Sequence, residues 1–155
     1  VAVVIGRRAD HIDAADAWAH VAGLSVVNDV SARDVQTAAM RAKPPGIGGS
    51  KSFPTFKPLG PCLATADAFD AQLDVGVTTK VNGELRQDGR TTEFLTPLSD
   101  LLAFISTRMV LEPGDVICTG SPRGVGMWLG GKFLVAGDVV EVEVEGVGVL
   151  RNTVA

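Results

Sequence analysis

The sequence predicts a β-rich α+β fold, a mixed β-sandwich roll or barrel-like domain with two short helices. Three observations support this prediction. Segments rich in β-branched residues outnumber helical patterns, at about seven strands against two helices. Tight-turn signals join most of these segments. Residues 139–146, VVEVEVEG, alternate apolar and acidic side chains, as a half-buried strand does. Short strands joined by tight turns are typical of a sandwich, roll or barrel.

The length of 155 residues predicts one domain spanning 1–155. The net charge of −4, without a block of five like charges, argues against nucleic acid as a partner. No apolar stretch approaches the about 18 to 20 residues of a membrane span, and no signal peptide is visible, so we expect no membrane partner and a cytoplasmic location. The chain opens on a strand-like segment without Met, which indicates a piece of a longer protein.

The N-terminal part of the chain predicts two strands around a short helix. Residues 1–6, VAVVIG, are typical of a buried strand. Asp13 is expected to cap a helix over 14–21 that stops at Gly23. A second strand is expected over 24–27.

The middle of the chain predicts a loop, a hairpin and a helix. Residues 41–50, with two Pro and three Gly, favour a mobile loop. In the segment 73–87, Asn82-Gly83 stands where a type I′ hairpin turn is wanted. Thr96 is expected to cap a helix that Pro97 opens and that runs to about residue 109.

The C-terminal third contains a short repeat. Residues 111–116 and 134–139 share the pattern L-x-x-G-D-V, and each predicts a tight turn that feeds a strand. In the second of these strands we expect the valines inside and Glu141, Glu143 and Glu145 on a solvated face rather than at a metal.

Two cysteines and two histidines are interpreted as structural. Cys62 and Cys118 stand in apolar segments without metal-ligand spacing, so we expect two reduced core thiols. His11 and His20 are expected to be surface or helix-packing residues.

Three segments carry polar groups suited to chemistry. Residues 28–36, NDVSARDVQ, follow a strand, and an oxygen ligand there suits Mg²⁺ or Mn²⁺, although the same pattern fits a turn and helix cap. Lys51 ends a Gly-rich loop that lacks the Walker spacing, and a lone loop lysine is commonly just solvated. Residues 119–126 combine hydroxyls and glycines that suit a carboxylate, and they fit a plain turn equally.

In this order, the motifs NDVSARDVQ, GGSKSFPTFKPLGP, VNGELRQDG, LEPGDVICTGSPRGVG and AGDVVEVEVEGVGVLRN closely resemble the fumarylacetoacetate hydrolase family over essentially the whole chain. The resemblance implies a β-sandwich roll, usually dimeric, so a homodimer is expected. It implies hydrolysis, decarboxylation or isomerisation of a small anionic keto acid, such as an acylpyruvate, oxaloacetate or a hydroxymuconate-type diacid. It also implies a divalent cofactor, Mg²⁺ or Mn²⁺, with Ca²⁺ as a further candidate.

The resemblance assigns roles to six residues. Asp29 matches a metal ligand, whose partner Glu-x-Glu pair in the family lies just before the strand at residues 1–6. Lys51 matches the catalytic lysine beside the metal, and Thr55 a hydroxyl near the ion. Gln36, Thr119 and Ser121 match substrate-binding positions. Pro54 departs from the family, where Asp is common.

In the mechanism that the resemblance implies, the ion acts as a Lewis acid on a chelated keto acid. The Lys51 ammonium stabilises the enolate oxygen, and the 41–50 loop closes to exclude water. Two other classes stay open: an inactive fragment or binding module with an incomplete metal site, and a non-enzymatic β-domain that serves oligomerisation.

Overall fold

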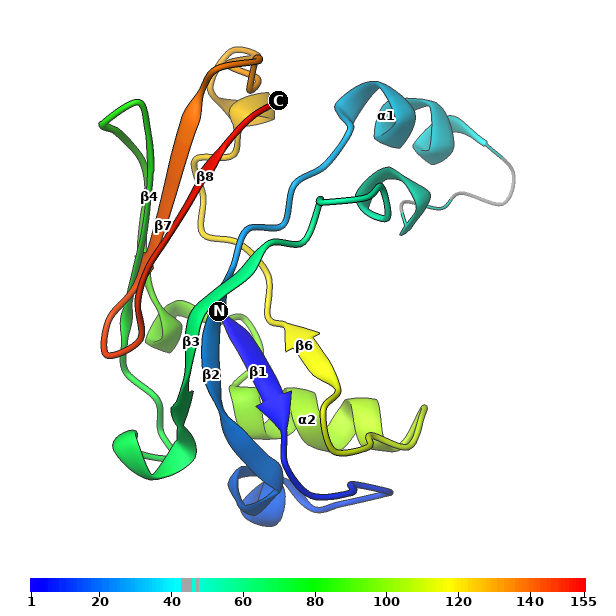
Figure 1. Ribbon diagram of the computed structural model, residues 1–155. Helices are drawn as coiled ribbons and strands as arrows, with labels where there is room; N and C mark the ends of the chain where they lie inside the picture. Colours follow the sequence, from blue (N-terminus) through cyan, green and yellow to red (C-terminus); the bar gives the residue numbers. More distant parts are fainter. Residues whose placement is uncertain (43–45, 47) are drawn as a thin grey trace.

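Two four-stranded sheets form the two layers of a sandwich in the computed structural model, which describes residues 1–42, 46 and 48–155 (Figure 1). The first sheet has the order β3-β2-β1-β6, and the second has the order β5-β4-β7-β8. Neighbouring strands in both sheets run antiparallel over the described residues. The strands are β1 (Ala2–Ile5), β2 (Val21–Val27), β3 (Leu59–Thr65), β4 (Gly76–Val81), β5 (Glu84–Arg90), β6 (Val116–Cys118), β7 (Val139–Val144) and β8 (Gly148–Thr153). The predicted β-rich α+β sandwich is therefore confirmed.

Two α-helices and five 3-10 helices complete the described part of the chain. They are α1 (Arg33–Arg41), α2 (Leu98–Ser106), η1 (Ala14–His20), η2 (Gly48–Lys51), η3 (Ala66–Ala68), η4 (Thr91–Glu93) and η5 (Gly126–Trp128). Helix α2 packs against η1 near one end of the first sheet, whereas α1 lies at the other end of the molecule (Figure 1). Among the described residues, we find no helix with the length and apolar character that crossing a bilayer requires.

One apolar core joins the two sheets. Val3 and Leu24 of the first sheet and Val142 of the second are buried in the same cluster, which Leu98 and Leu102 of α2 extend. Each fully buried side chain of this size stabilises the fold by about 1.5–3 kcal/mol relative to an exposed position. The core therefore holds the two sheets together, and polar side chains can lie at the ends of their strands.

The hairpin and the repeat form as predicted. Asn82 and Gly83 have φ of 52° and 80°, which is the type I′ geometry that joins β4 to β5. In the repeat, Asp115 accepts a hydrogen bond from the backbone N–H of Glu112 at 2.8 Å, and Asp138 accepts one from Val135 at 2.9 Å. Both turns lead directly into strands, β6 and β7.

The alternation of β7 is also confirmed. Val140, Val142 and Val144 are buried, and the glutamates lie on the outer face, where Glu141 approaches Arg151 and Glu145, just after the strand, approaches Arg90. Arginine side chains therefore pair with two of the three glutamates on this face.

The prediction for the helix over 14–21 is wrong in the type of helix and in its last residue. Residues Ala14–His20 form 3-10 helix η1, and Asp13 provides no side-chain cap. Val21 opposes Ile5, and Gly23 opposes Val4 in the ladder between β1 and β2. Strand pairing therefore begins three residues earlier than predicted and ends the helix.

Helix α1 is not among the predicted helices, although a turn and helix cap is one of the two interpretations of residues 28–36. Its sequence RDVQTAAMR is polar on average and has small alanines at most of its apolar positions, and its one buried residue is Gln36. Of the predicted 41–50 loop, residues 43–45 and 47 lie outside the described residues. Within the rest, Arg41 ends α1 and Gly48–Lys51 form η2.

Helix α2 is shorter than predicted. It begins at Leu98 after Pro97, so Thr96 is not its cap, and it ends at Ser106 rather than near residue 109. Its predicted buried stripe is confirmed at Leu98 and Leu102, while Ile105 packs on the core from a half-buried position.

The cysteines are reduced, as predicted, but they are not core residues. Cys62 and Cys118 lie on β3 and β6, the two edge strands of the first sheet, and both are exposed. Apolar neighbours in sequence did not reveal burial, because alternate residues of an edge strand face outward. His11 is exposed beside Asp10, and the ring of His20 lies 3.0 Å from the carbonyl oxygen of Arg8, which agrees with their structural interpretation.

Candidate active site

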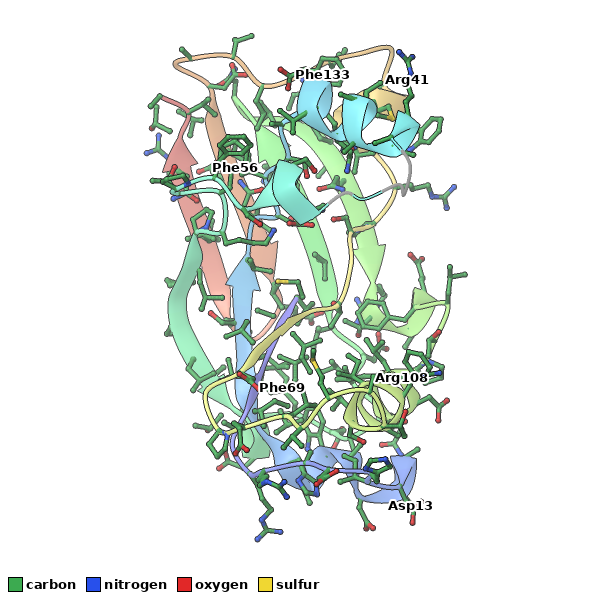
Figure 2. All side chains as sticks on the ribbon, turned by 90° about the vertical axis from the view of Figure 1, so that its right-hand side faces the viewer. Asp13, Arg41, Phe56, Phe69, Arg108 and Phe133 are labelled. Atoms are coloured by element: carbon green, nitrogen blue, oxygen red, sulfur yellow. The ribbon has the colours of Figure 1, made fainter. Side chains whose placement is uncertain are left out.

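A cavity of about 1590 Å³ lies between the second sheet and the layer formed by α1 and η2. Its walls come from the inner face of β4 and β7, the exit loop of β2, helix α1, residues 51–58 and the loop after β6. Phe56, Arg41 and Phe133 line this cavity and mark its end of the molecule in Figure 2, whereas Asp13 and Arg108 lie at the opposite end.

Three backbone hydrogen bonds hold the exit loop of β2 against residues 50–58. The N–H of Asn28 donates to the carbonyl of Pro58 at 3.2 Å, and that of Val30 donates to Phe56 at 3.2 Å. The N–H of Ala32 donates to Ser50 at 2.9 Å, immediately before α1 begins. These bonds place Asp29 opposite η2, in the wall of the cavity.

The carboxylate of Asp29 lies between two lysine ammonium groups. Lys51 donates to Oδ2 and Lys57 to Oδ1, and Lys57 Nζ also lies 3.5 Å from the carbonyl oxygen of Lys51. Burial raises the pKa of the Asp29 carboxyl, but the hydrogen bonds and the positive charges of Lys51 and Lys57 together lower it by more, so this pKa lies below its ordinary value. Asp29 is therefore a carboxylate at neutral pH.

The predicted substrate residue Gln36 is a buried residue of α1 and is not part of the described cavity wall. Its Oε1 accepts a hydrogen bond of 2.6 Å from the guanidinium of Arg33, and Arg33 itself lines the cavity. Of this pair, Arg33 is therefore the group that faces the cavity, and Gln36 orients it.

Thr55 lines the cavity from a tight turn. The N–H of Phe56 donates to the carbonyl of Phe53 at 3.1 Å, and Thr55 has φ of 71°. Pro54 occupies position i+1 of this turn, which proline favours, and the positive φ at position i+2 is typical of a type II turn. Pro54, which stands where the family commonly has Asp, is therefore compatible with the turn that carries Thr55.

The loop after β6 separates the two hydroxyls predicted to bind substrate. Ser121 lines the cavity, whereas the hydroxyl of Thr119 donates to the carbonyl oxygen of Val1 at 3.2 Å. Asp29, Lys51, Thr55 and Ser121 thus share one cavity, while Gln36 and Thr119 lie behind its described wall.

Sequence reasoning missed two basic residues of this site. Lys57 follows Lys51 by six residues in the same segment, and Arg33 follows Asp29 by four. Their closeness in sequence to predicted site residues was the one sign that could have indicated them. The described cavity wall carries six basic and two acidic side chains, although the whole chain has 14 basic and 18 acidic residues. These cavity residues are Arg33, Arg41, Lys51, Lys57, Arg86, Lys132, Asp29 and Asp34. The positive charge is therefore gathered at the cavity, which favours an anionic ligand.

A divalent ion does not find a sufficient set of ligands in the described residues alone. No cluster of three His, Cys, Asp or Glu side chains is present among them, and Asp29 faces ammonium groups on both oxygens. Mg²⁺ requires near-octahedral coordination by oxygen. Asp29 suits one such position, and the described residues do not complete the set.

Comparisons with known proteins identify the family of this chain. Residues 1–155 match the domain described as fumarylacetoacetate (FAA) hydrolase C-terminal. The human mitochondrial protein oxaloacetate tautomerase FAHD2A is 44% identical over 155 residues, covering 99% of this chain and 48% of its own length. The chain therefore spans about half the length of the curated relatives it matches.

Solved structures give the same result. A fumarylacetoacetate hydrolase from Exiguobacterium antarcticum has a TM-score of 0.90 and 42% identity, covering 99% of this chain and 53% of that one. A 5-carboxymethyl-2-hydroxymuconate delta-isomerase from Mycobacterium smegmatis has a TM-score of 0.87 and 41% identity, with coverage of 99% and 56%. The chain thus belongs to the fumarylacetoacetate hydrolase family, and it matches that family's C-terminal domain.

Proposed function

We propose that the protein containing this chain acts on a small anionic keto acid and stabilises its enolate in the cavity around Asp29 and Lys51. The relatives named as an oxaloacetate tautomerase and a hydroxymuconate isomerase support this substrate class, because both names describe the movement of a proton next to a carbonyl group. The observation that carries the proposal is the Lys51–Asp29 pair in the wall of a predominantly basic cavity.

In this proposal, Lys51 stabilises the oxygen on which negative charge collects. Its ammonium has three N–H donors, and the bond to Asp29 uses one of them. Hydrolysis, decarboxylation and isomerisation of a keto acid all develop charge on the carbonyl oxygen, so a donor fixed at this place assists each reaction. Asp29 orients the ammonium through this bond.

The neighbouring groups bind and orient the substrate. Arg33, held by Gln36, offers a guanidinium that suits a substrate carboxylate. Ser121 and Thr55 offer hydroxyls from two further sides of the cavity. Thr119 acts indirectly, because its hydroxyl ties the start of the Ser121 loop to Val1.

Metal dependence belongs to the same proposal, with Mg²⁺ or Mn²⁺ as the ion, Ca²⁺ as a further candidate, and Asp29 as the ligand that this chain supplies. A bound ion would supply Lewis acidity at the carbonyl group. Val1 and Asp29 line the same cavity, so residues joined to the N-terminal side of Val1 would meet the cavity wall. A homodimer and a cytoplasmic location also remain predictions.

The test is a substrate screen on the complete protein, with acylpyruvates, oxaloacetate and hydroxymuconate-type diacids in the presence of Mg²⁺. Turnover of at least one class, lost in Lys51→Ala, would support the proposal. Lys80→Ala is the matched control, because Lys80 is an exposed lysine of β4 outside the described cavity wall. If no class is processed, the binding-module or oligomerisation reading would replace the enzymatic one.

A further inference from the structure

Arg86 occupies an irregular position in the second sheet, at a β-bulge. In the ladder between β4 and β5, Lys80 opposes Leu85 and Thr79 opposes Gln87, so Arg86 is the extra residue between them. A bulge re-aims a side chain relative to a regular strand and is common beside active sites. Arg86 lines the cavity, whereas Arg90 farther along β5 pairs with Asp74 outside the described wall.

The guanidinium of Arg86 is only partly paired. Its side chain is 17% exposed, and its Nε is buried without a hydrogen-bond partner among the described residues. Its ion pair joins Nη2 to Glu84 at 3.1 Å, but Glu84 is 53% exposed and is shared with Lys132. An exposed pair of this kind contributes little, whereas a buried donor without an acceptor is costly.

The Ser121 loop packs directly on this bulge. Gln87 Nε2 donates to the carbonyl of Pro122 at 2.8 Å, and a Cβ added at Gly124 would overlap the carbonyl oxygen of Arg86. Close approach of these two backbones is therefore possible because residue 124 is glycine. Arg86 and the Ser121 hydroxyl consequently border the same part of the cavity, on the sheet side.

The proposed reacting centre lies on the other side of the cavity. Lys51 belongs to η2, which packs with α1, whereas Arg86 belongs to β5 of the second sheet. Figure 1 shows α1 and the second sheet on opposite sides of the intervening space, and the cavity joins them. A substrate with an anionic group at each end could therefore contact both sites.

We propose that Arg86 is a specificity-determining residue that binds a second, remote carboxylate of the substrate. The inference rests on the proposed function and narrows it to acylpyruvates that carry a carboxylate on the acyl group. The Arg86 side chain lines the cavity, and a planar guanidinium matches a carboxylate in two parallel hydrogen bonds.

The experiment compares fumarylpyruvate with acetylpyruvate on the complete protein, because both share the keto-acid centre and differ in the remote carboxylate. The unaltered protein should prefer fumarylpyruvate. Arg86→Gln should lower kcat/KM for fumarylpyruvate by about 10- to 100-fold, mainly through KM, and change acetylpyruvate less than about threefold. Arg86→Lys should fall between, because it keeps the charge and loses the fork.

Arg151→Gln is the control, since Arg151 is a 61% exposed arginine of the same sheet outside the described cavity wall, and it should change neither substrate. Equal losses for both substrates in Arg86→Gln and Arg86→Lys would overturn the inference, as would a protein that handles both equally or processes neither. Activity on oxaloacetate in the same preparation would then still uphold the proposed function.

Discussion

Replacing Asp29 by Asn tests the electrostatics of the site without relying on a substrate. The change removes the charge that two ammonium groups share, and it places an amide N–H₂ against one of them. Charge-assisted hydrogen bonds contribute about 1.5–3 kcal/mol. Because the lysine side chains are 28% and 42% exposed, solvent screening reduces the expected loss to about 1–2 kcal/mol.

This loss converts into a change in melting temperature. An unfolding entropy of about 2.1 cal/mol/K per residue, applied to 155 residues, predicts that Asp29→Asn lowers Tm by about 3 to 6 °C at pH 7. The measurement is thermal denaturation followed by circular dichroism at low salt. Asp88→Asn, an exposed position on β5, serves as the control and should shift Tm by less than about 1 °C.

The stabilisation by Asp29 should depend on pH in one direction only. Since the pKa of Asp29 is lower in the folded protein, its contribution is present above the unfolded pKa of about 3.9 and disappears as the pH falls through the folded pKa. The Tm difference between the unaltered protein and Asp29→Asn should therefore shrink below about pH 4. A difference that is constant with pH, or absent at pH 7, would refute this reasoning.

Three further predictions follow from the same structure. Lys51→Ala should reduce turnover by about 10²- to 10³-fold in steady-state assays, the loss typical of one oxyanion donor, and unaltered turnover would remove Lys51 from the mechanism. Leu102→Ala should cost about 2–5 kcal/mol in urea unfolding, because Leu102 is 1% exposed, whereas Leu85→Ala at an exposed site should cost less than about 1 kcal/mol. Calorimetry of the 155-residue chain with Mn²⁺ should show weak binding, since the described residues hold no group of three His, Cys, Asp or Glu ligands, and tight binding would mean that the ligands are misplaced.

Local patterns in the sequence predicted the elements whose geometry is local. The Asn82-Gly83 turn and the two L-x-x-G-D-V turns form as expected, because a few neighbouring residues determine their backbone angles and hydrogen bonds. The alternation in β7 was equally clear, because period-two burial is visible in the sequence itself.

Features that depend on pairing between distant segments were missed. Strand β2 begins at Val21 because β1 pairs with it, and Cys62 is exposed because β3 lies at a sheet edge. The periodicity of one segment does not show which strand it pairs with or whether it lies at a sheet edge.

The residues of the candidate site were also predicted only in part. The resemblance to a family indicated Asp29 and Lys51, and the structure brings these two residues together. The resemblance did not indicate Lys57 or Arg86. Lys57 reaches the site after the chain reverses at 53–56, and Arg86 lies at a bulge in β5. Such geometry arises from the fold, and a single sequence gives little sign of it.

The most direct test of the central claim is a crystal structure of the complete protein with Mn²⁺ and oxalate, a stable mimic of the enolate of a keto acid. We predict that oxalate lies in the cavity within hydrogen-bond distance of the Lys51 ammonium, and that Asp29 contacts the ion. An oxalate bound elsewhere, with Asp29 still held between Lys51 and Lys57 and no metal beside it, would contradict the account.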